Sequence, residues 1–173
     1  MAMFVVFALA LGALVALPIW QTQVQRENEQ ELIFRGKQYV EAVRLYQMKY
    51  PGSFPQSFEE LVEERCIRRL YKDPMTRDGL WNVILQTGEI GETGEMGDVQ
   101  TETAPQKIMV APQSALSAID LPIIIGVVSA SSRKSILVYR KQTTYDKWLF
   151  YYGQDPDKLP QIVYYGREEA AKD

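Results

Sequence analysis

The hydrophobic residues of this chain are concentrated at its beginning. Residues 1–20 contain no charged side chain, and about twenty apolar residues in a helix can cross the roughly 30 Å hydrocarbon core of a membrane. A charged stretch without proline follows directly, so the pattern predicts one continuous helix. We expect its first half, residues 1–22, to be transmembrane and its second half, residues 23–52, to be amphipathic.

The first half has the features of a retained anchor rather than a cleaved signal peptide. No basic residue precedes the apolar run, and bulky residues follow its small ones. Trp20 is at the interfacial position that indole rings favour, and Pro18 removes one backbone donor near the membrane edge. We expect contacts with lipid or with neighbouring helices from Phe4, Phe7, Leu9, Leu11, Leu14, Leu17, Pro18 and Trp20.

The second half carries an apolar stripe at helical spacing, which predicts one buried face. A row of tyrosines could form an electron path or a ligand shelf, but at this spacing core packing is the favoured interpretation. Glu31 and Arg35 lie elsewhere on the helix and are spaced to form an ion pair. The residues that we expect to pack the helix on a sheet are Leu32, Tyr39, Val43, Tyr46 and Tyr50, with Gly36 on the same face.

Pro51 and Gly52 end this helix. From residue 3 to residue 50 it would be about 70 Å long at the standard rise. No single small domain can cover a helix of that length. Much of its surface must therefore contact lipid or neighbouring subunits.

The pattern after the helix predicts an α+β head over residues 53–166. Ser57 and Glu60 form a capping box that opens a short second helix, which should continue to Leu70 and end before Asp73 and Pro74.

Four runs in the head read as strands, namely residues 79–85, 123–128, 135–140 and 147–152. A polar turn around Ser129, Ser131 and Ser132 should join the second and third runs. Short connections between strands favour a small antiparallel β-sheet. The sheet needs cover and the long helix has an apolar stripe, so the two should pack together.

Two segments after the long helix show no hydrophobic period. Residues 87–107 contain four glycines and several acids, which predicts a flexible acidic loop. Acidic residues there could coordinate a hard cation, but their spacing matches no calcium loop, so a solvated loop is favoured. Residues 167–173 should form a frayed tail.

The composition removes several classes of function. The chain has a net charge of −3, which argues against a nucleic-acid partner bound by phosphate neutralisation. It has no histidine and one cysteine, so a Ser-His-Asp triad, a Cys-His pair and a thiolate metal site are excluded. Cys66 should be a small buried side chain. We predict no catalytic, cofactor or metal site.

The order of these parts resembles the type IV pilin superfamily, most closely the pseudopilins of type II secretion. Residues 38–50 (QYVEAVRLYQMKY), followed by Pro51 and Gly52, resemble the end of that family's helix. Residues 71–74 (YKDP) and 79–81 (GLW) resemble its turn into the first strand. The resemblance covers residues 1 to about 85. Residues 1–173 show neither the cleavage glycine nor the glutamate that prepilin processing uses, so either these residues lie upstream of Met1 or the subunit is atypical.

This resemblance implies a methylated structural subunit of a pilus or pseudopilus filament, and not an enzyme. Its partners would be copies of itself, other pilin-like subunits, an inner-membrane assembly platform and membrane lipid. The resemblance implies a single-pass protein of the bacterial inner membrane with its head in the periplasm, or in a periplasmic or extracellular filament after assembly. Taken by themselves, the basic residues that follow the anchor would place the head in the cytoplasm. Long domains can nevertheless be translocated across the membrane despite such charges.

The resemblance transfers no ligand site. The major pseudopilin typically holds calcium in its last loop, where this chain offers Asp155 and Asp157 in surroundings that fit poorly. Two other hypotheses stay open. One is a monomeric membrane-anchored periplasmic domain for binding or sensing, and the other is an enzyme with an acidic site at Glu92, Glu95 and Asp98.

Overall fold

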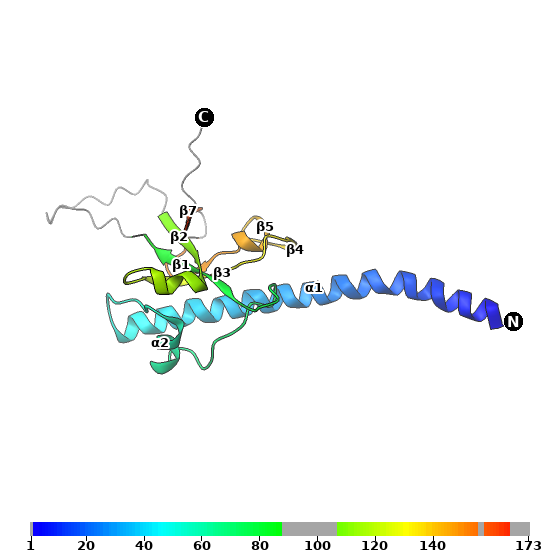
Figure 1. Ribbon diagram of the computed structural model, residues 1–173, viewed down its shortest axis with the longest axis horizontal. Coiled ribbons are helices and arrows are strands. Elements are labelled where there is room, and N and C mark those ends of the chain that lie inside the picture. Colours follow the sequence, from blue (N-terminus) through cyan, green and yellow to red (C-terminus); the bar gives the residue numbers. More distant parts are fainter. Residues whose placement is uncertain (1, 88–106, 156–157, 167–173) are drawn as a thin grey trace, which may run out of the picture.

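The computed structural model of the chain describes residues 2–87, 107–155 and 158–166, and for residues 2–20 the backbone alone. Figure 1 shows a long helix with a head packed on one of its halves. The elements, with η for 3-10 helices, are α1 (Ala2–Lys49), α2 (Phe58–Glu63), β1 (Trp81–Gln86), β2 (Lys107–Pro112), η1 (Gln113–Ala118), β3 (Ile124–Ser129), β4 (Lys134–Tyr139), β5 (Gln142–Thr144), η2 (Tyr145–Lys147), β6 (Phe150–Tyr151) and β7 (Gln161–Tyr164).

The fold is α+β, with an N-terminal helix packed on a mixed sheet of strand order β6-β3-β1-β2-β7. β1 pairs with β2 and β3, and β3 with β6, all antiparallel. The prediction of an antiparallel sheet is wrong for one pair, because β2 and β7 run parallel. A parallel pair needs a crossover, and the chain between these two strands passes through β3 to β6.

The third predicted strand, β4, does not belong to this sheet. It pairs with β5 in a separate two-stranded hairpin. The expected turn between β3 and β4 therefore leads out of the main sheet, because β3 already has β1 and β6 as neighbours. Ser129, which we assigned to that turn, is the last residue of β3 and is fully buried.

The second half of α1 lies against β3, β6 and β4. Gly36 allows the closest approach, since a Cβ atom there would be 2.4 Å from Cγ of Phe150. The core between helix and sheet includes Tyr39, Trp81 and Trp148. A second apolar cluster, which includes Ile84 and residues of β2 and β3, lies on the other face of the sheet.

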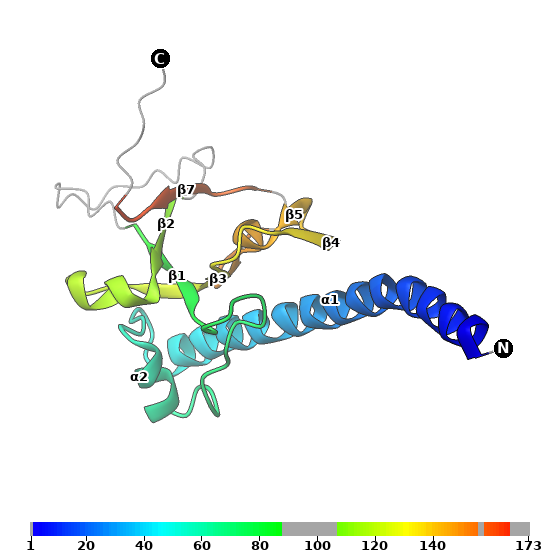
Figure 2. The same cartoon turned by 45° about the vertical axis from the view of Figure 1, so that its right-hand side comes forward.

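The first half of α1 projects beyond the head. The two views, turned by 45°, both show it running out past the sheet and α2 (Figures 1 and 2). The helix has 48 residues, which corresponds to about 72 Å at the standard rise. The head thus covers part of the helix, as the length argument from the sequence predicts.

Helix α2 begins as predicted and ends earlier. Oγ of Ser57 accepts a hydrogen bond from N of Glu60 at 3.2 Å, and the Glu60 carboxylate accepts one from N of Gln56 at 2.8 Å. The helix stops at Glu63 instead of continuing to Leu70. Arg65 has φ of +56°, a left-handed conformation that ends helices.

Candidate functional site

The predicted packing face of α1 lies against the head at four of its five residues. Leu32, Tyr39, Val43 and Tyr46 are 0%, 2%, 1% and 6% exposed. Tyr50 is 39% exposed and lies past the end of α1, where its hydroxyl donates to the Glu64 carboxylate at 2.8 Å. Tyr50 therefore contacts the α2 segment rather than the sheet, because the helix ends one residue before it.

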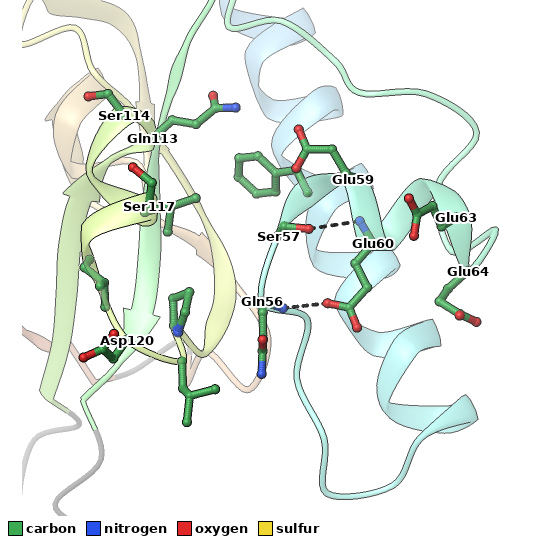
Figure 3. Close-up of a pocket in the computed structure, with 15 residues that line it drawn as sticks. Gln56, Ser57, Glu59, Glu60, Glu63, Glu64, Gln113, Ser114, Ser117 and Asp120 are labelled. Atoms are coloured by element: carbon green, nitrogen blue, oxygen red, sulfur yellow. Dashed lines mark hydrogen bonds between the residues drawn. The ribbon is translucent and has the colours of Figure 1, made fainter.

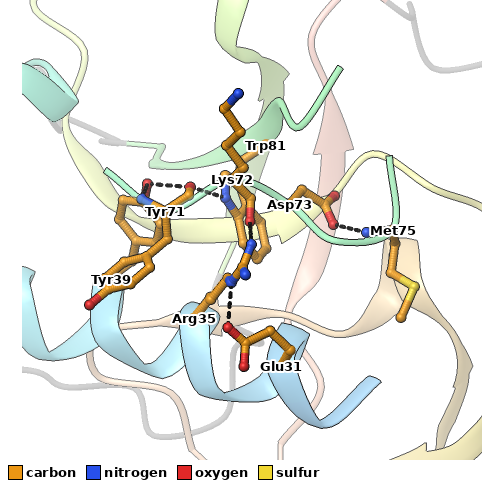
Figure 4. Close-up of polar contacts among 8 residues, drawn as sticks. All are labelled: Glu31, Arg35, Tyr39, Tyr71, Lys72, Asp73, Met75 and Trp81. Atoms are coloured by element: carbon orange, nitrogen blue, oxygen red, sulfur yellow. Dashed lines mark hydrogen bonds and ion pairs between the residues drawn. The ribbon is translucent and has the colours of Figure 1, made fainter. Parts of the chain in front are cut away.

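Tyr39 connects the middle of α1 to the segment that enters β1. Its hydroxyl donates to O of Tyr71 at 2.9 Å and accepts from N of Tyr71 at 3.0 Å. Nε1 of Trp81 donates to the same carbonyl at 2.8 Å, as Figure 4 shows. Burial is the main cause that raises the pKa of Tyr39 to about 12, so its hydroxyl stays protonated and can donate this bond.

Arg35 joins the same segment from one helical turn earlier. Its Nε atom lies 2.8 Å from the Glu31 carboxylate, which is the ion pair expected from the sequence. Its Nη1 atom donates to O of Lys72 at 2.7 Å. The ion pair orients the guanidinium group, and the bond to Lys72 holds that segment on the helix, as drawn in Figure 4.

Asp73 fastens the following turn to the end of β3. The carboxylate is buried, accepts from N of Met75 at 2.7 Å and accepts from Oγ of Ser129 at 2.7 Å. Arg133 donates to O of Met75 at 2.8 Å. The Asp-Pro pair that carries the family resemblance thus has a structural task in this chain: it joins the entry to β1 with the exit from β3.

Burial raises the pKa of Asp73 above its ordinary value of 3.8, although the hydrogen bonds from Ser129 and Met75 oppose the shift. The folded state therefore binds this proton more tightly than the unfolded state does. The stability that Asp73 contributes is complete below pH 3.8 and is lost as the pH rises through its folded pKa.

Asp73→Asn should remove this decline, because asparagine has no proton to lose while its carbonyl can still accept from Met75. The measurement is the urea midpoint of both proteins between about pH 3 and 7. The other carboxylates act equally in the two proteins, so the difference between the profiles isolates Asp73. Parallel profiles would contradict the prediction.

Glu29 forms a buried anchor point that the sequence patterns did not reveal. It lies in α1 and is 0% exposed. Its carboxylate accepts from N of Ile136 at 2.7 Å, from N of Leu137 at 2.8 Å and from the hydroxyl of Tyr145 at 2.6 Å. Gln25, one turn earlier, donates to the same hydroxyl at 2.8 Å.

The irregular pairing of β4 explains why a carboxylate is needed there. The register shifts between Lys134 and Tyr139, so the strand carries extra residues opposite β5. Such a bulge leaves backbone N–H groups without ladder partners, and Glu29 accepts from two consecutive ones. A helix residue thereby ties the β4–β5 hairpin to α1. The sequence did hold a signal, because Glu29 lies three residues before Leu32 and so continues the apolar stripe of α1, unlike its neighbours Glu27 and Glu31.

Burial, followed by the hydrogen bond to Glu29, raises the pKa of Tyr145 to about 12. The phenol therefore remains a donor to the Glu29 carboxylate over the physiological range of pH. Together with Tyr39, Tyr145 gives the helix–head interface two neutral buried hydroxyls.

The other end of α1 is attached to α2 by polar contacts. The Tyr46 hydroxyl donates to the Glu60 carboxylate, and Lys49 forms an ion pair with Glu64. The helix is therefore held at three levels, by β4 near Glu29, by the residue 71–73 segment in the middle and by α2 at its end.

A groove of about 1000 Å³ lies between α2 and the segment from η1 to Pro122 (Figure 3). Among the described residues, its lining carries five carboxylates and no lysine or arginine. Glu60 and Glu64 bond to α1, as described above. Glu59, Glu63 and Asp120 are exposed, so solvent screens their charges. The groove offers a polar surface rather than a buried reacting group.

Several predicted residues lie outside the description. The side chains of Phe4, Phe7, Leu9, Leu11, Leu14, Leu17, Pro18 and Trp20 are not described, and neither are residues 88–106, 156–157 and 167–173, which hold the predicted acidic loop, Asp157 and the tail. In the part of the chain that the structure does describe, no helix is both long and apolar enough to cross a membrane.

The cysteine differs from its prediction. Cys66 is partly buried rather than fully buried, and burial raises the pKa of its thiol. Within residues 2–87, 107–155 and 158–166, no three His, Cys, Asp or Glu side chains are grouped as metal ligands.

No protein-family model, curated protein or solved structure matches the chain. Its function must therefore be inferred from its own residues and geometry.

Proposed function

We propose that this chain is a structural subunit of a filament of the type IV pilin kind, similar to the pseudopilins of type II secretion. In this proposal the protein does its work by assembly. The projecting halves of α1 bundle in the filament core, and the heads face outward. Copies of the chain, other pilin-like subunits and an inner-membrane assembly platform are its proposed partners.

The observation that carries the proposal is the unequal cover of α1. Its second half is buried in the head through Leu32, Tyr39, Val43 and Tyr46, and its first half continues beyond the head (Figure 2). Residues 1–20 of that half contain no charge. An apolar helix without cover from its own head is suited to contact with lipid or with sister helices.

The proposed location is the inner membrane, with the head in the periplasm before assembly. Transfer from bilayer to filament exchanges one apolar environment for another, which costs little hydrophobic free energy. Work for extraction would come from an assembly ATPase. The attachment of α1 to the head at three levels supports this role, because force on the helix would reach the head through rigid contacts.

Glutamine substitution of Leu9, Leu11 or Leu14 tests the proposal. Each variant should lose filament assembly, because an amide side chain in an apolar helix bundle carries hydrogen-bonding groups that find no water. Filaments would be counted by electron microscopy in cells that express the assembly machinery. Leu121→Gln is the matched control, since Leu121 is an exposed leucine of the head and should tolerate the change.

Normal filaments from all three helix variants would overturn the proposal. Loss of filaments in the Leu121→Gln control would show that the assay reports any damage to the protein.

A monomeric anchored domain for binding is the second candidate, and the groove in Figure 3 favours it. The two candidates differ in what the groove does. Glu59→Gln, Glu63→Gln and Asp120→Asn can be combined in one variant. This variant should still form filaments under the filament proposal. If the groove is the binding site of an anchored domain, the variant should lose ligand binding instead.

A further inference from the structure

An exposed apolar surface lies where the segment before β1 crosses α1. The ring of Tyr71 meets the ring of Phe34 edge-on, with 6.3 Å between their centroids, and Cζ of Arg69 lies 5.4 Å from the Tyr71 centroid. Phe34 and Leu70 remain 50% and 37% exposed. We call Phe34 and residues 69–72 the aromatic patch. The head leaves its apolar side chains partly uncovered, as contact surfaces do.

The aromatic patch is basic as well as apolar. Arg69, Lys72 and the adjacent Arg68 are exposed, and none of them forms an ion pair with another described residue. Asp73, the carboxylate that follows in the chain, is buried. Tyrosine and arginine are enriched among the residues that carry binding free energy at protein interfaces. The patch therefore has the composition of a contact surface for an acidic partner.

The groove beside α2 has the opposite charge (Figure 3). Its exposed carboxylates are Glu59, Glu63 and Asp120, and no ion pair within residues 2–87, 107–155 and 158–166 involves them. The partly buried Leu116 and Ile119 add apolar surface to its lining. The groove thus complements the aromatic patch in charge and shares its apolar character.

The two surfaces lie at different levels along α1. The groove belongs to the level of Tyr46, because Glu60 of its lining bonds to that residue, and Figure 2 shows α2 beside the C-terminal end of the helix. The patch belongs to the level of Phe34. Twelve residues separate these two levels, which is about 18 Å at the standard rise. Parallel copies that are shifted along α1 can therefore bring the patch of one to the groove of the next.

We propose that the aromatic patch of one copy docks in the acidic groove of the next copy along the filament. This inference rests on the filament proposal and adds a directional contact between heads to it. A head-to-tail contact leaves one surface of each kind free at the ends, so it propagates instead of closing into a pair. Two patches or two grooves would repel each other, which fixes the direction.

The contact supplements the helix bundle and does not replace it. Bundled α1 helices hold the heads at a high effective concentration, so a contact with few ion pairs is sufficient. Assembly itself still comes from α1. Loss of the contact therefore leaves filaments in place, and the two proposals can fail separately.

Cross-linking between two single-cysteine chains tests the contact. Both full chains carry Cys66→Ser. One has Leu70→Cys in the patch and the other has Ser117→Cys in the groove, at an exposed position of its lining. They are co-expressed with the assembly machinery, and the filaments are treated with a short bis-maleimide reagent. The mixture should give a covalent dimer, and either chain alone at least about fivefold less of it.

Charge reversal separates recognition from damage to the head. Arg69→Glu with Lys72→Glu in the patch chain should lower the dimer yield at least about fivefold, because like charges then face each other. Glu59→Lys with Glu63→Lys in the groove chain should restore the yield. Such a rescue requires the two surfaces to meet, since neither change repairs the other within a damaged head.

The matched control reverses two exposed cations elsewhere on the head. Lys107→Glu with Lys141→Glu in the patch chain should leave the dimer yield unchanged, because neither residue belongs to the patch or lines the groove. An equal loss of yield in this control would overturn the proposal, since net charge and not the patch would then govern the contact.

Three further results would overturn the proposal. Filaments that give no dimer between patch and groove would exclude this contact and leave the filament proposal standing. A dimer from the Leu70→Cys chain alone, at the yield of the mixture, would show that the patch meets its own copy. A parent chain that forms no filaments would overturn the filament proposal and this contact with it.

Discussion

Replacing Glu29 with alanine should lower the free energy of unfolding by about 3–5 kcal/mol, which corresponds to a fall in Tm of roughly 6–20 °C. The carboxylate accepts from two backbone N–H groups of β4 and from the Tyr145 hydroxyl. These three donors lose their acceptor in the variant, and so does Nε2 of Gln25, which donates to the same carboxylate at 3.2 Å. Water has little access to a residue that is 0% exposed. Urea unfolding followed by tryptophan fluorescence measures the change.

Glu27→Ala is the matched control for this prediction. Glu27 lies on the same helix, is exposed and accepts a hydrogen bond from Gln23 at 3.0 Å. Its removal should change stability by no more than about 0.5 kcal/mol. If Glu29→Ala were as mild as its control, Glu29 could not be what holds the β4–β5 hairpin on α1.

Gly36→Ala should destabilise the protein by about 1–3 kcal/mol, although helix propensity alone predicts a gain of about 1 kcal/mol. The added Cβ atom would lie 2.4, 2.5 and 2.8 Å from three ring carbons of Phe150. That ring is 1% exposed, and its centroid lies 5.3 Å from that of Tyr139. The clash is relieved only if the ring leaves its contact with Tyr139 or the helix moves away from β6, and either shift disturbs the packing. The urea midpoint measures the loss.

A second substitution distinguishes the clash from other effects of the alanine. In a Gly36→Ala background, Phe150→Leu should cost less than it does alone, because the smaller side chain leaves room for the new methyl group. Lys37→Ala, at an exposed neighbouring position, should be nearly neutral. A stabilised Gly36→Ala variant would mean that Phe150 does not pack on the helix as closely as the structure has it.

The buried face of α1 could be predicted from the sequence because it depends on local helix geometry. A repeat near 3.6 residues assigns a buried face whatever lies against it, and Leu32, Tyr39, Val43 and Tyr46 are buried accordingly. Tyr50 continued the same spacing but falls after Lys49, the last residue of the helix. A period in the sequence therefore predicts a face only as far as the backbone keeps its helical form.

The sequence indicated where strands lie better than it indicated which strands pair. Residues 79–85, 123–128 and 135–140 were recognised, and they correspond to β1, β3 and β4. The run predicted at 147–152 contains β6, which has two residues. β2 and β7 were missed. β7 has four residues and pairs parallel with β2, which follows from where the chain returns after β6 and not from any pattern within either strand.

β4 was predicted as a strand, but its hairpin partner β5 was missed for a different reason. The Arg140–Lys141 turn lacks the Asn-Gly signature by which such turns are recognised. In the structure Arg140 and Lys141 nevertheless adopt the positive φ values of such a turn, +48° and +63°.

By itself, the sequence determined the long helix, its uncharged first half, the buried face of its second half and the α+β class of the head. These features follow from composition and from periods of a few residues, which act locally. The tertiary structure alone decided the mixed strand order and the contact of Glu29 with β4. Each of these joins residues far apart in the chain, and such pairings depend on the path of the whole backbone, which no local pattern encodes.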